Sequence, residues 1–231
     1  MTAAIDTLLF DFGGTLDADG VAWKDRFYAL YRAEGLDMTA EAFASAFYAA
    51  DDPLVGALPL TAGLSETVHA LAANLESELG GAGSDRGQRV ASRFLSDASA
   101  IFARNRPALD ALGQRYRLGV VSNFYGNLEA VCRSAGLARL FAVMTDSCRV
   151  GAEKPDPAIF RAALETLDST PERTVYIGDS LPRDCEGARR AGMGFIWIAP
   201  EGVQAAAAQA SLPGPVRAAL TQLPDLLNIL K

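Results

Sequence analysis

The stretch that decides the fold lies near the N-terminus and reads Leu8-Leu9-Phe10-Asp11-Phe12-Gly13-Gly14-Thr15-Leu16. Its apolar start, bounded by glycines, predicts a buried strand that ends at Asp11. In open α/β sheets, ligands bind beyond the carboxyl ends of the strands, so we expect Asp11 to lie at a functional edge. Two positions later, Gly13 stands where a second acid would complete a pair of nucleophile and general acid/base.

The composition is that of an ordinary folded protein. The chain has 231 residues, of which 50% are hydrophobic and 21% are charged. This is enough for one buried core and a smaller second unit. The formal net charge of −7 argues against a general nucleic-acid binder, because such proteins need a basic surface. An anionic substrate would therefore need a locally basic pocket.

The cysteines and the N-terminus favour a cytoplasmic protein. Cys132, Cys148 and Cys185 form no CxxC pair and cannot all be bridged, which argues against a disulfide framework or a structural zinc site. The first residues show no basic segment ahead of a long apolar stretch, and no apolar run approaches the roughly 18 residues of a membrane span. We expect neither an export signal nor a membrane anchor, and the sequence indicates no oligomeric state.

From Arg115 onward, short apolar runs alternate with helical stretches. Strands are predicted at residues 118–122, 141–144, 174–177 and 195–198, and helices at 128–135, 157–167, about 182–191 and the Ala-rich 203–210. Strands separated by helices of this length predict right-handed βαβ units and a parallel sheet. The strand that ends at Asp11 joins this sheet, so the predicted fold class is α/β.

The region between the first and second strands has a different pattern. Apolar and aromatic residues recur there at helical spacing, as in Trp23, Phe27 and Leu30, and predict an all-helical insertion at residues 18–106. Residues 1–17 and 107–231 then form the core. We expect most of the insertion's aromatic residues to pack in its interior. Those near its start could instead reach a substrate when the insertion closes over the site; these candidates are Trp23, Lys24, Arg26 and Tyr28.

Polar residues follow four of the predicted strands. They are Asp11 with Thr15, Ser122-Asn123, Lys154-Pro155-Asp156-Pro157, and the segment Gly178 to Asp184 that contains Asp179. Taken alone, each has an ordinary structural explanation as a turn, a helix cap, a solvated lysine or a charge at a helix N-terminus. Because parallel strands present their carboxyl ends at one edge, the four together predict a single site.

The chemistry of these residues fits phosphoryl transfer. A carboxylate such as Asp11 can attack phosphorus and form an acyl phosphate. Ser122 and Lys154 can stabilise charge on the transferring oxygens. Asp179 can bind Mg²⁺ together with Asp11 and a backbone carbonyl. Directly after Ser122-Asn123, Phe124 and Tyr125 are candidates to line the entrance, and with Thr15 and Asn123 they complete the predicted substrate-binding set.

The ordered motifs resemble those of the haloacid dehalogenase-like (HAD) hydrolase superfamily. The matching segments are Asp11 to Thr15, Ser122-Asn123, Lys154 to Phe160, and Gly178 to Asp184 with Ala191-Gly192-Met193 behind it. The helical insertion is similar to the small C1-type cap domain of that superfamily. The resemblance implies a Rossmann-like, doubly wound core, a mobile cap, dependence on Mg²⁺ and an aspartyl-phosphate intermediate.

The resemblance also implies a role for each residue of the site. Asp11 would be the nucleophile, and Ser122 with Lys154 would hold the phosphoryl group. The metal would be bound by Asp11, the Gly13 carbonyl and Asp179, with Asp184 supporting the metal shell. Thr15 would orient the first loop. Gly13 departs from the pattern of typical phosphatases in the superfamily, which carry a second Asp there, and general acid/base catalysis of this kind is usually worth about 10²–10⁴-fold.

The leading hypothesis is a Mg²⁺-dependent phosphatase for a small phosphorylated metabolite, with a preference for good leaving groups because of Gly13. Three alternatives remain open. A phosphate- or partner-binding scaffold would retain the fold without turnover. A 2-haloacid dehalogenase would act without metal, but such relatives have a Ser/Asn-rich segment where this chain has Gly178-Asp179. A phosphonate-cleaving enzyme would need a cap lysine, and Lys24 lies too close to the first motif to match.

Overall fold

The computed structural model describes residues 4–81, 84–200, 202 and 217–230. The helix predicted at residues 203–210 lies outside these ranges. Of the helices within them, none combines the length and the apolar character needed to span a membrane.

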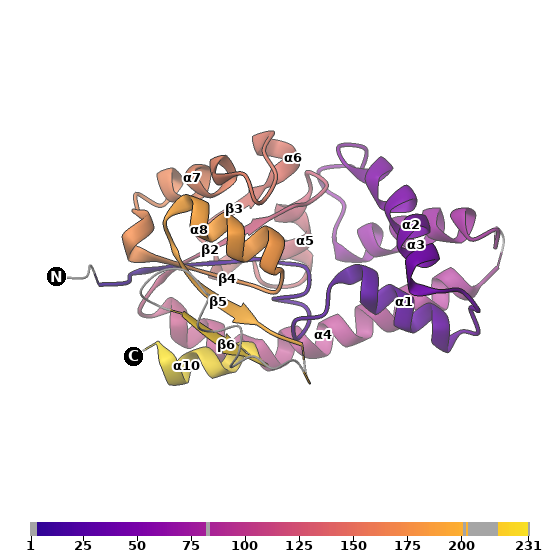
Figure 1. Cartoon of the computed structure of the whole chain (residues 1–231), viewed down its shortest axis with the longest axis horizontal. Helices are drawn as coiled ribbons and strands as arrows, with labels where there is room; N and C mark the ends of the chain where they lie inside the picture. Colours follow the sequence, from indigo (N-terminus) through magenta and orange to yellow (C-terminus); the bar gives the residue numbers. More distant parts are fainter. Residues whose placement is uncertain (1–3, 82–83, 201, 203–216, 231) are drawn as a thin grey trace.

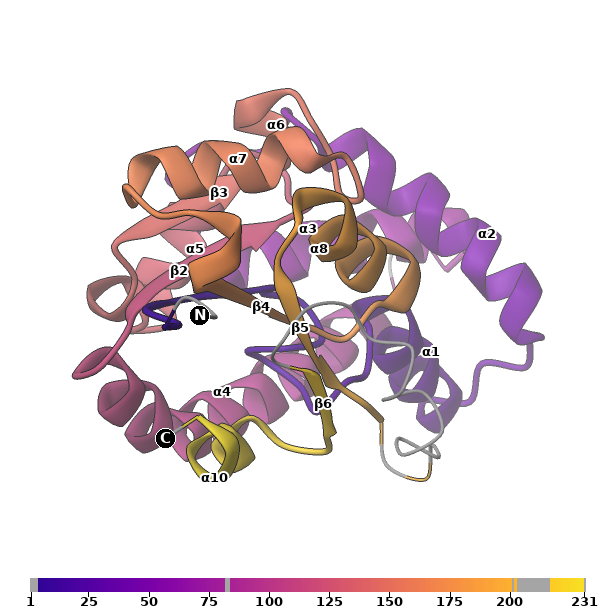
Figure 2. The same cartoon turned by 60° about the vertical axis from the view of Figure 1, so that its left-hand side comes forward.

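A six-stranded parallel sheet forms the centre of the molecule, with the strand order β3-β2-β1-β4-β5-β6 (Figures 1 and 2). β1 lies in the middle and pairs Phe10 with Val120 of β2 and with Ile177 of β4. The chain leaves β1 toward β2 on one side and later returns to β4 on the other, and such switch points are where α/β sheets bind ligands. The predicted α/β fold is confirmed. The strands are β1 (Thr7–Phe10), β2 (Arg117–Ser122), β3 (Val143–Asp146), β4 (Thr174–Gly178), β5 (Gly194–Ile198) and β6 (Arg217–Leu220).

Helices cover both faces of the sheet, because successive strand residues point to opposite sides. Leu8 and Phe10 pack in one core with α4, α5 and α10, whereas Leu9 packs in a second core with α7 and α8. This is the doubly wound arrangement that the sequence predicts. The covering helices are α4 (Arg86–Gly113), α5 (Leu128–Ser134), α6 (Ser147–Val150), α7 (Pro157–Thr166), α8 (Glu186–Ala191) and α10 (Leu226–Ile229).

Three further helices, together with the N-terminal half of α4, lie beyond the carboxyl ends of the strands (Figure 1). We call these the insertion helices: α1 (Trp23–Ala33), α2 (Ala40–Asp51) and α3 (Leu64–Glu78) with the start of α4. Their interior is aromatic, with the rings of Phe27 and Phe94 centred 4.8 Å apart. The boundary predicted between residues 106 and 107 falls within α4, which continues through Pro107. The division into two domains at that point stays a prediction.

The segment from Leu181 to Ala191 differs from the sequence expectation. Instead of one helix over residues 182–191, a π-helical turn at Leu181–Cys185 precedes α8. Asp184 in this turn is fully buried, and its Oδ2 accepts a hydrogen bond of 2.9 Å from the Ser180 backbone N–H. Single π-helical turns often occur at functional sites. Here the wide turn brings Asp184 beneath the edge of the sheet.

Candidate active site

Asp11 follows β1 directly and is held at the carboxyl edge of the sheet. Its backbone N–H donates to the Ile177 carbonyl at 2.8 Å, which ties it to β4. The residue is buried, with 7% exposure. The Oδ1 atom accepts a 2.8 Å hydrogen bond from Ser122 Oγ and lies 2.7 Å from Lys154 Nζ. The predicted nucleophile therefore has a hydroxyl donor and a cation in place, each from a different segment.

Lys154 lies between two carboxylates. Its Nζ is 2.7 Å from Oδ1 of Asp11 and 2.7 Å from Oδ1 of Asp184. Burial alone would lower the pKa of Lys154, but the charges of the two carboxylates more than offset this and raise the pKa. The lysine is therefore a fixed cation. Asn123 clamps its backbone, accepting from Lys154 N at 2.7 Å and donating to Lys154 O at 3.2 Å.

Tyr176 completes this group and was not predicted from the sequence. Its buried hydroxyl lies 3.0 Å from Lys154 Nζ and donates to the Val121 carbonyl at 2.7 Å. Burial, with the charge of Asp184, raises the pKa of Tyr176 well above its usual value. The available signal was a tyrosine between the aliphatic Val175 and Ile177 of a predicted buried strand, where a buried hydroxyl needs a partner.

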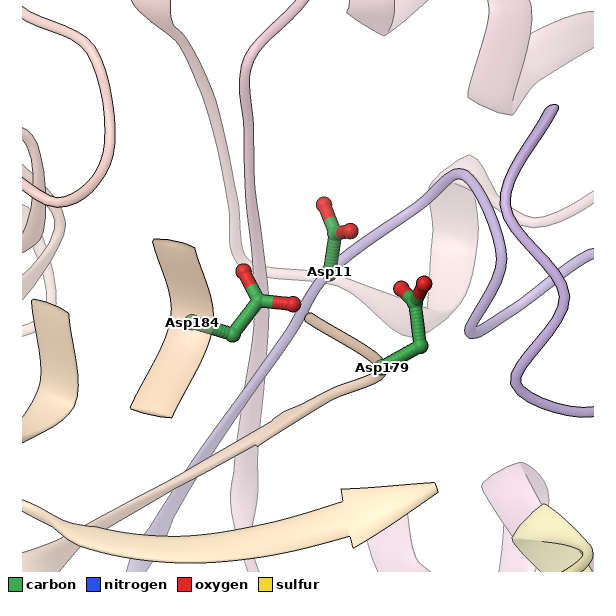
Figure 3. A group of neighbouring side chains, drawn as sticks. All are labelled: Asp11, Asp179 and Asp184. Carbon is green, nitrogen blue, oxygen red and sulfur yellow. The ribbon is translucent and has the colours of Figure 1, made fainter. Parts of the chain in front are cut away.

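Three carboxylates meet at this edge of the sheet. Asp11, Asp179 and Asp184 are buried and place ligand oxygens within 4.8 Å of one another. Figure 3 shows the carboxyl groups of Asp11 and Asp179 pointing in the same direction, with Asp184 approaching from the neighbouring segment. Burial and then the charges of Asp184 and Asp11 raise the pKa of Asp179 well above its usual value. Clustered carboxylate oxygens with excess negative charge are the donor set that fits Mg²⁺.

The first loop is built so that it can pass close to Asp179. Gly14 has a φ of +92°, and a Cβ there would lie 2.6 Å from Asp179 Oδ2, so both backbone and space require glycine. Thr15 is fully buried and donates to Asp179 Oδ1 at 3.1 Å. This hydrogen bond holds the Asp179 carboxylate in place. The predicted contact of Thr15 with substrate stays a prediction.

Asp17 links this loop to the insertion helices and is a second residue that sequence reasoning missed. It is fully buried, and its Oδ1 accepts from the Gly14 backbone N–H at 2.7 Å. Its Oδ2 accepts from Trp23 Nε1 and from Arg26 Nη1, each at 2.7 Å. A buried carboxylate needs such partners, and the acid directly after the apolar Leu16 was the signal in the sequence.

The space beside Gly13 is covered by the indole of Trp23. A Cβ on Gly13 would lie 3.2 Å from Trp23 Cδ1 and from Trp23 Nε1. The indole is fixed by Asp17 and by edge contacts with Phe94 and Phe124, whose ring centroids are 5.1 Å and 6.0 Å away. A side chain at position 13 would therefore make a tight contact with an aromatic ring from α1.

Replacing Gly13 with alanine should lower the free energy of unfolding by about 1–3 kcal/mol, the usual cost of overpacking. The reason is that the indole must shift by a few tenths of an ångström to admit the new methyl group, and it is held on several sides. Denaturant unfolding measures the change. Gly113→Ala is the matched control, because a Cβ there makes only an ordinary contact of 3.6 Å with Leu118. Equal stability of the two variants would contradict the prediction.

A cavity of about 290 Å³ opens between the insertion helices and the sheet edge. Of the predicted site, its walls contain Asp11, Gly13, Ser122, Asn123, Phe124, Tyr125 and Lys154. The insertion helices add Trp23, Lys24, Asp25, Phe47, Tyr48 and Asp51, and the π-helical turn adds Arg183.

Two of the four cap candidates, Arg26 and Tyr28, do not line the cavity. Arg26 packs its guanidinium 3.7 Å above the Phe94 ring centroid, and the Tyr28 hydroxyl donates to the Met38 carbonyl at 2.9 Å. Asp51 and Arg183, in contrast, line the cavity although no sequence motif marked them for substrate contact. With Lys24 and Lys154, Arg183 gives the cavity walls the positive charge that an anionic ligand would need.

Comparison with known proteins places this geometry in a family. A model of haloacid dehalogenase-like hydrolases matches residues 5–192. The haloacid dehalogenase-like hydrolase domain-containing protein 3 of Bos taurus is 42% identical over 86 residues, which are 37% of this chain and 34% of that protein. Phosphoserine phosphatase of Thermus thermophilus is 42% identical over 64 residues, 28% of this chain and 26% of that protein. The matched segments thus span about a third or less of these two relatives.

Solved structures have a similar fold over 99–100% of this chain. A magnesium-bound HAD-hydrolase of Bacillus subtilis has a TM-score of 0.56 at 21% identity, covering 99% of this chain and 100% of that one. A dehalogenase, crystallised with an intermediate complex, has a TM-score of 0.62 at 19% identity, covering 100% and 99%. At such identities these similarities establish the fold and leave the reaction to be argued from the site.

Proposed function

The chain belongs to the haloacid dehalogenase-like hydrolases, and we propose that it is a Mg²⁺-dependent phosphatase that acts on a small phosphorylated metabolite. The observation that carries the proposal is the position of Lys154, whose Nζ lies 2.7 Å from Asp11 and 2.7 Å from Asp184 at the base of the cavity. A cation fixed beside a carboxylate nucleophile suits an anionic phosphoryl group.

Asp11 is the proposed nucleophile. Ser122 and Lys154 both contact its Oδ1, and among the described residues no hydrogen bond reaches Oδ2, which is therefore the oxygen free to attack. When a phosphoryl group enters, the Ser122 hydroxyl and the Lys154 ammonium are placed to bind its oxygens. Formation of an acyl phosphate on Asp11 then splits the displacement into two steps.

Asp11, Asp179 and the Gly13 carbonyl would hold the metal, and Asp184 would support them. Bound Mg²⁺ would neutralise charge on the phosphoryl oxygens. The magnesium in the B. subtilis relative and the cluster of three buried carboxylates support this part of the proposal. The insertion helices serve as the proposed cap, since Trp23 and Asp51 face the same cavity as Asp11. From the cysteine pattern we retain the expectation of a cytoplasmic enzyme.

A panel of phosphate esters assayed with Mg²⁺ tests the function. Asp11-dependent release of phosphate supports it. Absence of turnover across alkyl, aryl and acyl phosphates would refute it. Halide release from 2-haloacids that survives a chelator would instead assign metal-independent dehalogenation.

Removal of the metal should abolish phosphate release, and added Mg²⁺ should restore it. Asp179→Asn should raise the Mg²⁺ concentration needed for half-maximal activity by at least about 10-fold, because one carboxylate ligand is lost. The same variant should lose the rise in Tm that Mg²⁺ gives the parent protein, since a ligand stabilises only the state that binds it. Asp110→Asn, at an exposed i,i+4 ion pair with Arg106, is the control. Equal Mg²⁺ dependence in both variants would contradict the assigned ligand.

A further inference from the structure

The reaction proposed above leaves one proton unaccounted for, and the following inference rests on that function. An alkoxide leaving group needs a proton as its bond to phosphorus breaks. Gly13 has no side chain to supply it, and the Trp23 indole lies only 3.2 Å from where a Cβ would be. The donor must therefore come from another wall of the cavity.

We propose that Asp51, the last residue of α2, donates this proton and later takes one from the attacking water. Asp51 lines the same cavity as Asp11. The Tyr125 hydroxyl donates to its Oδ1, which orients the carboxyl group and leaves Oδ2 as the oxygen that can carry a proton. Within the described ranges, no lysine, arginine or histidine forms an ion pair with Asp51.

The position of Asp51 is fixed from two sides. Tyr125 belongs to the loop that directly follows Ser122, the last residue of β2 and the hydrogen-bond donor to Asp11. The backbone N–H of Gly56, just beyond α2, donates to the Tyr125 carbonyl at 3.0 Å. A side-chain bond and a main-chain bond thus join the end of α2 to the loop beside the nucleophile.

The surroundings of Asp51 favour its protonated form. It lies at the C-terminus of a twelve-residue helix, where the helix dipole disfavours a negative charge. Burial raises the pKa of Asp51 and the charge of Asp52 adds to the rise, while the Tyr125 hydrogen bond and the charge of Arg183 act in the opposite direction. The net effect is a carboxyl group that holds its proton to higher pH than a free aspartate, as a general acid requires.

The other acids in the cavity are less suited. Asp25 is exposed and forms an ion pair with Lys24. Tyr125 has its pKa raised well above the usual value by burial and by the charge of Asp51, so it releases a proton less readily. Lys154 is engaged by two carboxylates.

The proton balance closes over the two steps. In the first, an Asp11 oxygen forms a bond to phosphorus, the bond from phosphorus to the leaving oxygen breaks, and the Asp51 proton passes to that oxygen. In the second, water attacks phosphorus, the bond to Asp11 breaks, and the Asp51 carboxylate takes a proton from the water. Asp11 and Asp51 are then restored, and the products are an alcohol and inorganic phosphate.

The test compares leaving groups in the full-length protein with Mg²⁺, using 4-nitrophenyl phosphate, phenyl phosphate and an alkyl phosphate. Asp51→Asn should lower kcat/KM by about 10²–10⁴-fold for the alkyl ester. It should change kcat/KM for the nitrophenyl ester by less than about threefold, because nitrophenolate leaves without a proton. Turnover of the nitrophenyl ester also shows that the variant is folded. Asp37→Asn, at an exposed residue outside the cavity, should leave all three values unchanged.

A second measurement concerns the intermediate. With the nitrophenyl ester, Asp51→Asn should accumulate phosphorylated Asp11, detected as an intact-mass increase after acid quench, because the attacking water has lost its proton acceptor.

An equal loss of kcat/KM for all three esters would overturn the proposal and make Asp51 a residue that only shapes the cavity. An unchanged kcat/KM for every ester would overturn it as well. Absence of turnover by the unmodified protein on any phosphate ester would instead refute the phosphatase function itself.

Discussion

Asp11→Asn should abolish phosphate release, with a fall in kcat on the order of 10⁴-fold or more, the scale seen when a covalent nucleophile is removed. An amide cannot form the acyl phosphate. The substitution is isosteric, and its side-chain oxygen can still accept from Ser122, which lies 2.8 Å from Oδ1. The fold should therefore persist, so that the loss reports on chemistry.

Activity across the phosphate-ester panel, measured beside the unfolding midpoint, checks this expectation. Trapping with beryllofluoride and Mg²⁺ gives an independent readout, because the adduct requires the Asp11 carboxylate. The parent protein should form it and Asp11→Asn should not. Retention of more than about a tenth of the parent kcat would contradict a nucleophilic role, since that corresponds to less than about 1.4 kcal/mol of transition-state stabilisation.

Lys154→Met should lower the free energy of unfolding by about 3–5 kcal/mol, the usual consequence of removing one partner from a buried ion pair. The methionine fills a similar volume but leaves Asp11 and Asp184 without their cation, at exposures of 7% and 0%. Chemical denaturation in the presence of a chelator measures the effect without interference from bound metal.

Adding Asp184→Asn to Lys154→Met should recover part of the lost stability, because it removes one of the unpaired charges. The control is Lys24→Met. Lys24 pairs with the exposed Asp25, and surface pairs of this kind contribute about 0–1 kcal/mol. A loss below about 1 kcal/mol for Lys154→Met would contradict the prediction, since it would mean that the two carboxylates are not left as uncompensated buried charges.

At position 13, the sequence shows which side chain is missing and the structure shows what lies beside it. In the sequence, Gly13 stands where typical phosphatases of the superfamily carry a second Asp. The structure places the Trp23 indole 3.2 Å from where a Cβ would lie. A side chain at position 13 therefore requires the indole to shift by a few tenths of an ångström.

The sequence by itself determined the parallel sheet and the residues at its carboxyl edge. Buried parallel strands are short apolar runs, and each of the four motifs follows directly on such a run or lies close behind it. Asp11, Ser122, Lys154 and Asp179 could be assigned to one edge because parallel strands of one sheet all end on the same side.

Only the tertiary structure decided which side chains complete the site. Tyr176 meets Lys154 across 22 positions of sequence, and Tyr125 meets Asp51 across 74. Asp17 became recognisable as a link to α1 only once Trp23 and Arg26 were seen to donate to it. A hydrogen bond between distant residues leaves no periodic pattern in the chain, because it depends on how separately formed helices and strands pack. The physical reason is that periodicity records which face of an element is buried, whereas the partner of a buried polar group is chosen by the packing of the whole molecule.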